Sequence, residues 1–144
     1  AGATGTGRVV PLMRYLLDTN AVIALLNDPA GQVSQRARQH TPADIGLPAV
    51  VVHELHFGAF GSRRQARNVA IVDGLQFETV GFDREDARHA GEVRAALAAA
   101  GTPIGAYDVL IAGQARSRDL VLVTRNVREF NRVAGLRVED WDAA

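Results

Sequence analysis

Three acidic residues lie at positions where a charge needs a binding partner. Asp18 directly follows the apolar run Tyr15–Leu17, and Glu54 and Asp108 each lie in an otherwise apolar helical pattern. A lone charge among apolar residues is costly unless something binds it. Hard oxygen ligands without cysteine favour Mg²⁺ or Mn²⁺. The three acids therefore predict a divalent-metal site.

The predicted strands bring these acids to one edge of a sheet. Asp18 ends a first strand, and Thr124-Arg125-Asn126 ends the fourth. The C-terminal ends of parallel strands meet at one edge, so Asp18 and Asn126 are expected there, with Glu54 and Asp108 packed over it. A metal held by such acids lowers the pKa of a water and neutralises charge on a phosphoryl oxygen. This layout is typical of a metal-dependent nuclease.

Structural roles are the alternatives for the same residues. Asp18 can cap the helix that begins near Asn20, and Asp108 can be a first-turn acid favoured by the helix dipole. Glu54 has apolar neighbours, so its alternative is pairing with an arginine. His53 and His56 are three residues apart rather than the four of the zinc-protease helix motif, which favours structural or surface roles for them.

Strand-like and helix-like segments alternate along the chain. The predicted strands are Met13–Asp18, Ile45–Leu47, Phe77–Val80, Leu120–Thr124 and a final edge strand Arg137–Glu139. The predicted helices are Asn20–Leu26, Gln32–His40, Ala49–Phe60, Arg63–Leu75, a long helix from an Asp83–Asp86 capping box to Ala100, Ala106–Arg118 and Val127–Arg132. This order predicts an α/β fold with a mostly parallel sheet of about five strands and helices on both faces.

Composition limits the class of protein. The chain has 144 residues, 47% of them hydrophobic, which suits one domain over residues 13–144 after a flexible leader or cloning remnant at 1–12. It has no cysteine, which excludes disulfides and thiolate zinc sites and fits a cytoplasmic location. Its apolar runs are far shorter than the roughly 20 residues of a membrane span.

Charge gives a local rather than a global clue to RNA binding. The 16 acidic and 16 basic residues cancel, and every basic residue is arginine, so a catalytic lysine is excluded. Arginine binds phosphate in bidentate fashion, so local arginines can still hold RNA. The candidates for RNA contact are Arg63, Arg64, Arg67 and Arg125.

Together these motifs resemble the PIN-domain ribonuclease toxins of bacterial toxin–antitoxin modules, the VapC family. The resemblance runs from Met13 to Trp141. Its carriers are Leu16-Leu17-Asp18-Thr19-Asn20, Glu54-Leu55 with Gly58, Gly101-Thr102-Pro103-Ile104-Gly105-Ala106-Tyr107-Asp108, Leu122-Val123-Thr124-Arg125-Asn126 with Glu129-Phe130, and Gly135-Leu136-Arg137-Val138-Glu139-Asp140-Trp141. The loop before Asp108 and the Val-Glu-Asp-Trp ending resemble the enterobacterial-type branch.

The resemblance implies a PIN fold and a Mg²⁺-dependent endoribonuclease of the bacterial cytoplasm, in which Mn²⁺ can substitute. It implies a homodimer that is inhibited by a VapB antitoxin, whose C-terminal segment occupies the acidic pocket, and that joins the antitoxin on operator DNA. Relatives with these loop motifs cut initiator tRNA in the anticodon loop, which is the expected substrate here.

The resemblance also assigns roles to residues. It gives metal binding to Asp18, Glu54 and Asp108, and puts the uncharged Asn126 at the fourth acidic position, so one metal ion is expected rather than two. Thr19, Asn20 and Thr124 are expected to position ligands and water. The alternative is a catalytically weakened module that acts through antitoxin and operon DNA. A phosphatase or receiver domain would need a lysine, which the chain lacks.

Overall fold

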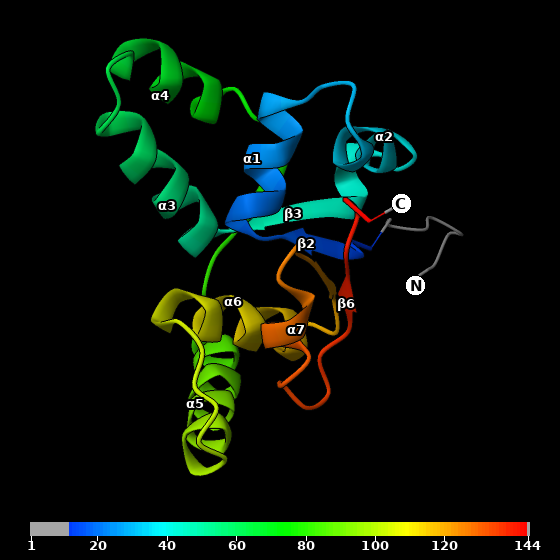
Figure 1. Ribbon diagram of the computed structural model, residues 1–144, viewed down its shortest axis with the longest axis vertical. Helices are drawn as coiled ribbons and strands as arrows, with labels where there is room; N and C mark the ends of the chain where they lie inside the picture. The colour runs from blue at the N-terminus through cyan, green and yellow to red at the C-terminus, as the bar shows by residue number, and fades with distance from the viewer. Residues whose placement is uncertain (1–11, 144) are drawn as a thin grey trace, which may run out of the picture.

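Five parallel strands form the centre of the molecule. The computed structural model describes residues 12–143, and the predicted leader lies outside them apart from Leu12. The sheet has the order β4-β3-β2-β5-β6, and every neighbouring pair is parallel (Figure 1). Its strands are β2 (Tyr15–Leu17), β3 (Ile45–Pro48), β4 (Glu78–Val80), β5 (Val121–Val123) and β6 (Val138–Glu139).

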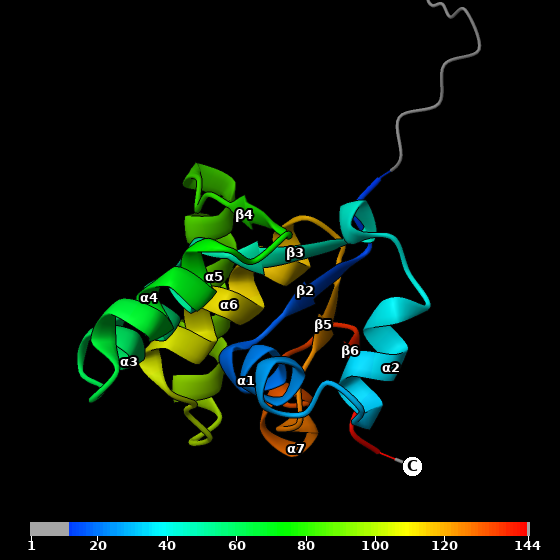
Figure 2. The same cartoon turned by 90° about the horizontal axis from the view of Figure 1, so that it is seen from above.

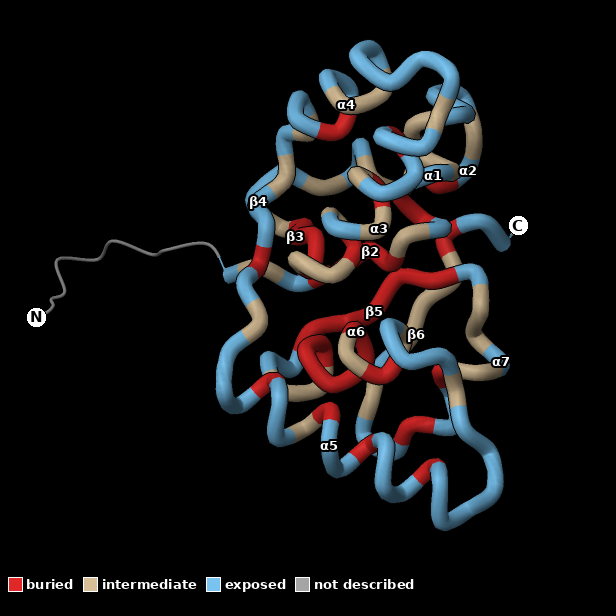
Figure 3. The backbone as a smooth tube through the Cα atoms, turned by 90° about the vertical axis from the view of Figure 1, so that its left-hand side faces the viewer, coloured by how far each residue is buried: buried red, intermediate tan, exposed pale blue. Residues whose placement is uncertain are grey.

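Helices cover both faces of this sheet. One group, α1 to α4, lies on one face, and α5, α6 and α7 lie on the other (Figures 1 and 3). Their bounds are α1 (Thr19–Asn27), α2 (Gln32–Arg38), α3 (Ala49–Phe60), α4 (Gln65–Asp73), α5 (Arg84–Ala99), α6 (Ala106–Ser117) and α7 (Val127–Phe130). The predicted α/β fold is thus confirmed. Between residues 12 and 143, no helix combines the length and apolar character that a bilayer crossing requires.

The register of the strands fixes the edge at which the site forms. Tyr15 lies opposite Ile45 and Val121, and Leu17 lies opposite Val123. Leu16 and Leu17 are fully buried because helices cover both faces, as is usual for parallel sheets (Figure 3). The residues that follow β2 and β5 therefore emerge at the same edge.

Some element boundaries differ from the predicted ones. The helix predicted to reach His40 ends at Arg38, and a short 3₁₀ helix, η1 (Pro42–Asp44), with a Thr41–Asp44 capping box, leads into β3. The helix predicted from Arg63 begins at Gln65 instead. Gly61-Ser62 interrupts the helical run, so Arg63 and Arg64 lie in a turn.

Candidate metal centre

Asp18 lies directly after β2 at the C-terminal edge of the sheet. Its side chain is buried, and its Oδ1 accepts a hydrogen bond from the Ala21 N–H at 2.9 Å. It is therefore the N-cap of α1, so the structural role weighed above is real. Asp18 combines this role with a position at the edge where the other acids gather.

Glu54 approaches this edge from α3. It is half-buried, and its Oε1 accepts a hydrogen bond from the Thr19 hydroxyl at 2.8 Å. Among the residues described, Glu54 forms no ion pair with an arginine. Thr19 follows Asp18 directly, so this bond holds the second acid beside the first.

Asp108 lies in the first turn of α6, on the other face of the sheet. A Cβ atom added at Gly105 would lie 3.3 Å from the Asp108 Oδ2, so this glycine gives the carboxylate room against the backbone. Partial burial and the charges of Asp18, Glu54 and Glu129 raise the pKa of Asp108 to about 6. The four acids thus share one electrostatic environment, and we call them the acidic cluster.

The pKa of Asp18 also indicates that it belongs to the acidic cluster. Burial raises the pKa of Asp18, and the charge of Glu54 raises it further. Hydrogen bonds from the Thr124 hydroxyl and the Ala21 N–H and the positive charge of Arg125 act against this rise. The net direction is upward, as expected for a carboxylate in a partly desolvated group of like charges.

Glu129 is a site residue that sequence reasoning missed. It lies on α7, and its Oε2 accepts a hydrogen bond from the Asn126 Nδ2 at 2.7 Å. Asn126 therefore orients a carboxylate at the fourth acidic position, where the sequence predicted an uncharged residue. The available signal was the spacing of three residues between an amide at a strand end and an acid on the following helix.

The donor set of the acidic cluster suits a divalent cation. Within residues 12–143, no three His, Asp or Glu side chains are gathered closely enough to hold a metal ion as they stand. The four carboxylates nevertheless lie near enough for Asp108 to feel the charges of the other three. Such negative charge is what a divalent cation neutralises, and carboxylate oxygens are the ligands of Mg²⁺ and Mn²⁺. The side chains of the acidic cluster therefore suit a divalent cation.

The remaining predicted residues lie in three places. Arg125 follows the end of β5 near Asp18, and Asn20 and Arg125 line a neighbouring groove. Arg63 and Arg64 are exposed in the turn between α3 and α4, at the end of that hairpin away from the sheet (Figure 1). Arg67, on α4, lines a groove between α1, α3 and α4. Arg125 is thus the candidate RNA contact that lies beside the acids.

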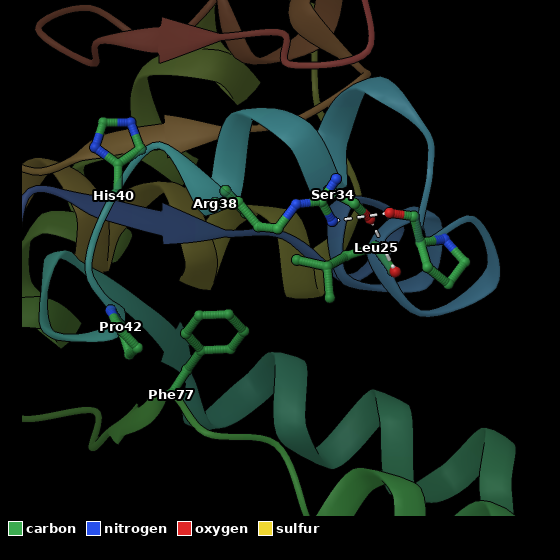
Figure 4. A pocket seen from close by; sticks show the side chains of 8 residues that line it. Leu25, Ser34, Arg38, His40, Pro42 and Phe77 are labelled. Atoms are coloured by element: carbon green, nitrogen blue, oxygen red, sulfur yellow. Dashed lines mark hydrogen bonds between the residues drawn. The ribbon is translucent and has the colours of Figure 1, made fainter.

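A further cavity of about 450 Å³ lies at the opposite edge of the sheet (Figure 4). Pro42 and Phe77, which precede β3 and β4, contribute to its wall. Inside it, Arg38 donates a hydrogen bond to the Pro29 carbonyl, and Ser34 donates one to the Leu25 carbonyl. None of the predicted site residues lines this cavity.

Comparison with known proteins decides the family. The family model for the PIN domain matches residues 15–136, which include all four acids of the cluster. The chain belongs to the PIN domain family. The chain is 39% identical over 132 residues to a protein of Salmonella typhimurium named tRNA(fMet)-specific endonuclease VapC. The alignment covers 90% of this chain and 99% of that protein.

Solved structures of PIN domains agree with this assignment. The DNA-bound VapBC structure from Salmonella typhimurium matches with a TM-score of 0.86 and 39% identity over 90% of this chain and 99% of that one. VapBC2 from Rickettsia felis, bound to a promoter DNA fragment, matches with a TM-score of 0.83 and 29% identity. The match covers 90% of this chain and 100% of that one. The chain is thus a PIN-domain nuclease of the VapC type, a class that generally depends on a metal.

Proposed function

We propose that this chain is the toxin of a type II toxin–antitoxin module and cuts initiator tRNA in the anticodon loop with Mg²⁺ as cofactor, for which Mn²⁺ can substitute. The observation that carries the proposal is the acidic cluster, in a chain 39% identical to a protein named tRNA(fMet)-specific endonuclease. This substrate implies a bacterial cytoplasmic location.

The acidic cluster would hold the cation through Asp18, Glu54, Asp108 and Glu129. When bound, the cation supplies a water of lowered pKa and neutralises charge on the phosphate. The neighbours of the acids fix their orientation: Thr19 holds Glu54, Thr124 holds Asp18, and Asn126 holds Glu129. Hydrogen bonds of this kind are what keeps metal ligands in productive geometry.

The weakened-module alternative depends on a missing fourth acid. Glu129 contributes a carboxylate close enough to raise the pKa of Asp108. This charge supports the catalytic function over a module that acts only through its partners. The exposed Arg63 and Arg64 and the α4 residue Arg67 would contact the RNA backbone outside the cluster.

We infer a VapB-type antitoxin as the protein partner. A groove of about 530 Å³ between α1, α3 and α4 is lined by the apolar side chains of Ile23, Leu26 and Ile71 and includes Glu54. An apolar segment of the antitoxin's C-terminal part can lie in this groove and direct an arginine to the acidic cluster. The structural relatives described as VapBC bound to DNA support a toxin that joins its antitoxin on operator DNA. We propose that the toxin takes part as a homodimer.

Cleavage of RNA by the purified protein tests this function. Total RNA and initiator tRNA are incubated with Mg²⁺ or Mn²⁺, and the cut ends are mapped. We expect a single cut in the anticodon loop, its loss with EDTA, and its loss in Asp18→Asn. The asparagine keeps an oxygen for the Ala21 N–H, so the variant is expected to retain the α1 cap. Undiminished cleavage with EDTA would refute the metal dependence.

A further inference from the structure

Helices α1 and α2 lie side by side (Figure 2), and a groove of about 300 Å³ lies between them. Asn20, in the first turn of α1 two residues after Asp18, lines this groove. Its other polar side chains are Asn27, Asp28, Gln32, Arg125 and Asp142. A volume of this size is at the lower end of the range for small-molecule sites, about 300 to 1,000 Å³.

Arg125 is held at the boundary between this groove and the acids. Its side chain is 61% exposed and forms an ion pair with Asp142. Its positive charge still reaches Asp18, where it acts against the rise in pKa that burial causes. The guanidinium is therefore kept from collapsing onto the acidic cluster, and donors of its fork stay free for another acceptor.

The C-terminal segment holds Asp142, the ion-pair partner of Arg125, in place. The Asp142 N–H donates a hydrogen bond to the Asp140 Oδ1 at 2.9 Å. Between them, Trp141 is 1% exposed and anchors the chain in the core. Asp142 is thus a positioning residue that sets where the guanidinium lies.

We propose that the α1–α2 groove binds the nucleotide next to the scissile phosphate, with Arg125 on a phosphate and the amides of Asn20, Asn27 and Gln32 on the base edge. This inference rests on the proposed ribonuclease function. Arginine forks match phosphate oxygens, and side-chain amides pair with the edges of unstacked bases in RNA loops. The side-chain amides of this groove, together with the guanidinium of Arg125, favour RNA as its occupant.

Steady-state cleavage of a short RNA that contains the mapped cut site tests the groove. We expect Arg125→Gln to raise KM by about 10- to 100-fold with little change in kcat, and Arg125→Lys to recover part of the loss. The slope of log KM against log salt should fall by ~0.7, the value for one phosphate contact to a single strand. The matched control is Arg88→Gln, an exposed arginine on α5 across the sheet, which should behave as the unchanged protein.

Asp142→Asn tests the positioning role. We expect a smaller rise in KM, and no additional rise when it is combined with Arg125→Gln, because both changes act through one guanidinium. Additive effects would overturn the role of Asp142.

Two results separate this inference from the proposed function. An Arg125→Gln variant with unchanged KM and salt slope, in a protein whose cleavage still needs metal and Asp18, would overturn the groove alone. Weakened antitoxin binding by that same variant would then identify the groove as a protein site. Failure of the unchanged protein to cut any RNA would overturn the proposed function, and the groove assignment with it.

Discussion

Asp108 is the acid on which charge and partial burial act most clearly. Partial burial, and then the charges of three other carboxylates, raise its pKa to about 6 from an ordinary value of 3.8. The folded protein therefore binds a proton here that the unfolded chain releases at lower pH. The stability contributed by this proton is fully present below pH 3.8 and is lost as the pH rises through about 6.

The first prediction concerns the stability that the protein loses when Asp108 is ionised. Asp108→Asn should raise the melting temperature of the metal-free protein at pH 7.5, because it removes a repelled charge. The gain should be clearly smaller at pH 4.5, where Asp108 is protonated in the folded protein and only the unfolded chain ionises it. Thermal melts at the two pH values in EDTA measure the difference. An equal gain at both values would contradict the assigned cause.

A second prediction follows from competition between protons and metal for the same carboxylate. The apparent affinity for Mg²⁺ should increase between pH 5 and pH 7, because Asp108 loses its proton in this range. Titrations of cleavage rate against Mg²⁺ at several pH values provide the measurement. A constant affinity across the range would exclude Asp108 as a ligand.

Sequence reasoning could identify the residues whose position depends on local structure. Asp18 follows an apolar strand and Asp108 lies in the first turn of an apolar helix, and both facts can be read from short windows. Glu129 could not be assigned in this way, because its effect on Asp108 depends on how α7 packs relative to α6. The ion pair between Arg125 and Asp142 likewise joins residues 17 positions apart.

At the scale of elements, α6 is the helix that carries Asp108 into the site. It lies between the sheet and α5, and its inner residues Ile111 and Ala112 are almost fully buried. A Cβ atom at Gly113 would lie 2.5 Å from the Ala90 Cα on α5. The two helices therefore approach closely at this glycine, and the approach sets the position of α6.

A third prediction uses two helical glycines as a matched pair. Gly113→Ala should lower the free energy of unfolding by about 1–3 kcal/mol, because the added methyl group overlaps backbone. Gly91→Ala on α5, where no atom lies within 4 Å, should instead raise it by up to about 1 kcal/mol through helix propensity. Urea denaturation compares them. Similar effects from both substitutions would refute the close approach.

Element types were predictable where capping and periodicity agree. The Asp83–Asp86 capping box is confirmed, with both reciprocal hydrogen bonds at 2.9 Å. The boundaries near Thr41 and Arg63 were wrong by a few residues, because a 3₁₀ turn and a broken helix depend on local hydrogen bonds that periodicity does not reveal. The strand order was not predicted, since it requires knowledge of which apolar strands pair.

At the scale of the whole molecule, the acidic cluster lies between the two helical layers. Glu54 comes from one face of the sheet and Asp108 from the other. Two grooves lie near this cluster: the α1–α3–α4 groove includes Glu54, and the α1–α2 groove includes Asn20 and Arg125. The two grooves share Ile23 and Asn27, so a protein inhibitor and an RNA substrate would compete both for the acids and for part of the surface around them.

A fourth prediction follows for the toxin–antitoxin complex. If an antitoxin arginine neutralises the acidic cluster, replacing that arginine by alanine should release cleavage activity while the complex stays assembled. RNA cleavage by the purified complex gives the measurement, and size-exclusion chromatography is the control for assembly. Persistent inhibition in an intact complex would show that the antitoxin blocks the site in another way.

The central claim is that the acidic cluster holds the divalent cation required for RNA cleavage. Its most direct test is a Mn²⁺ titration in which bound metal is measured by electron paramagnetic resonance and cleavage of initiator tRNA is followed in the same samples. We predict that cleavage rises in proportion to bound Mn²⁺ and that Asp18→Asn loses both while remaining folded. An Asp18→Asn protein that binds Mn²⁺ and cuts RNA as the unchanged chain does would contradict the claim.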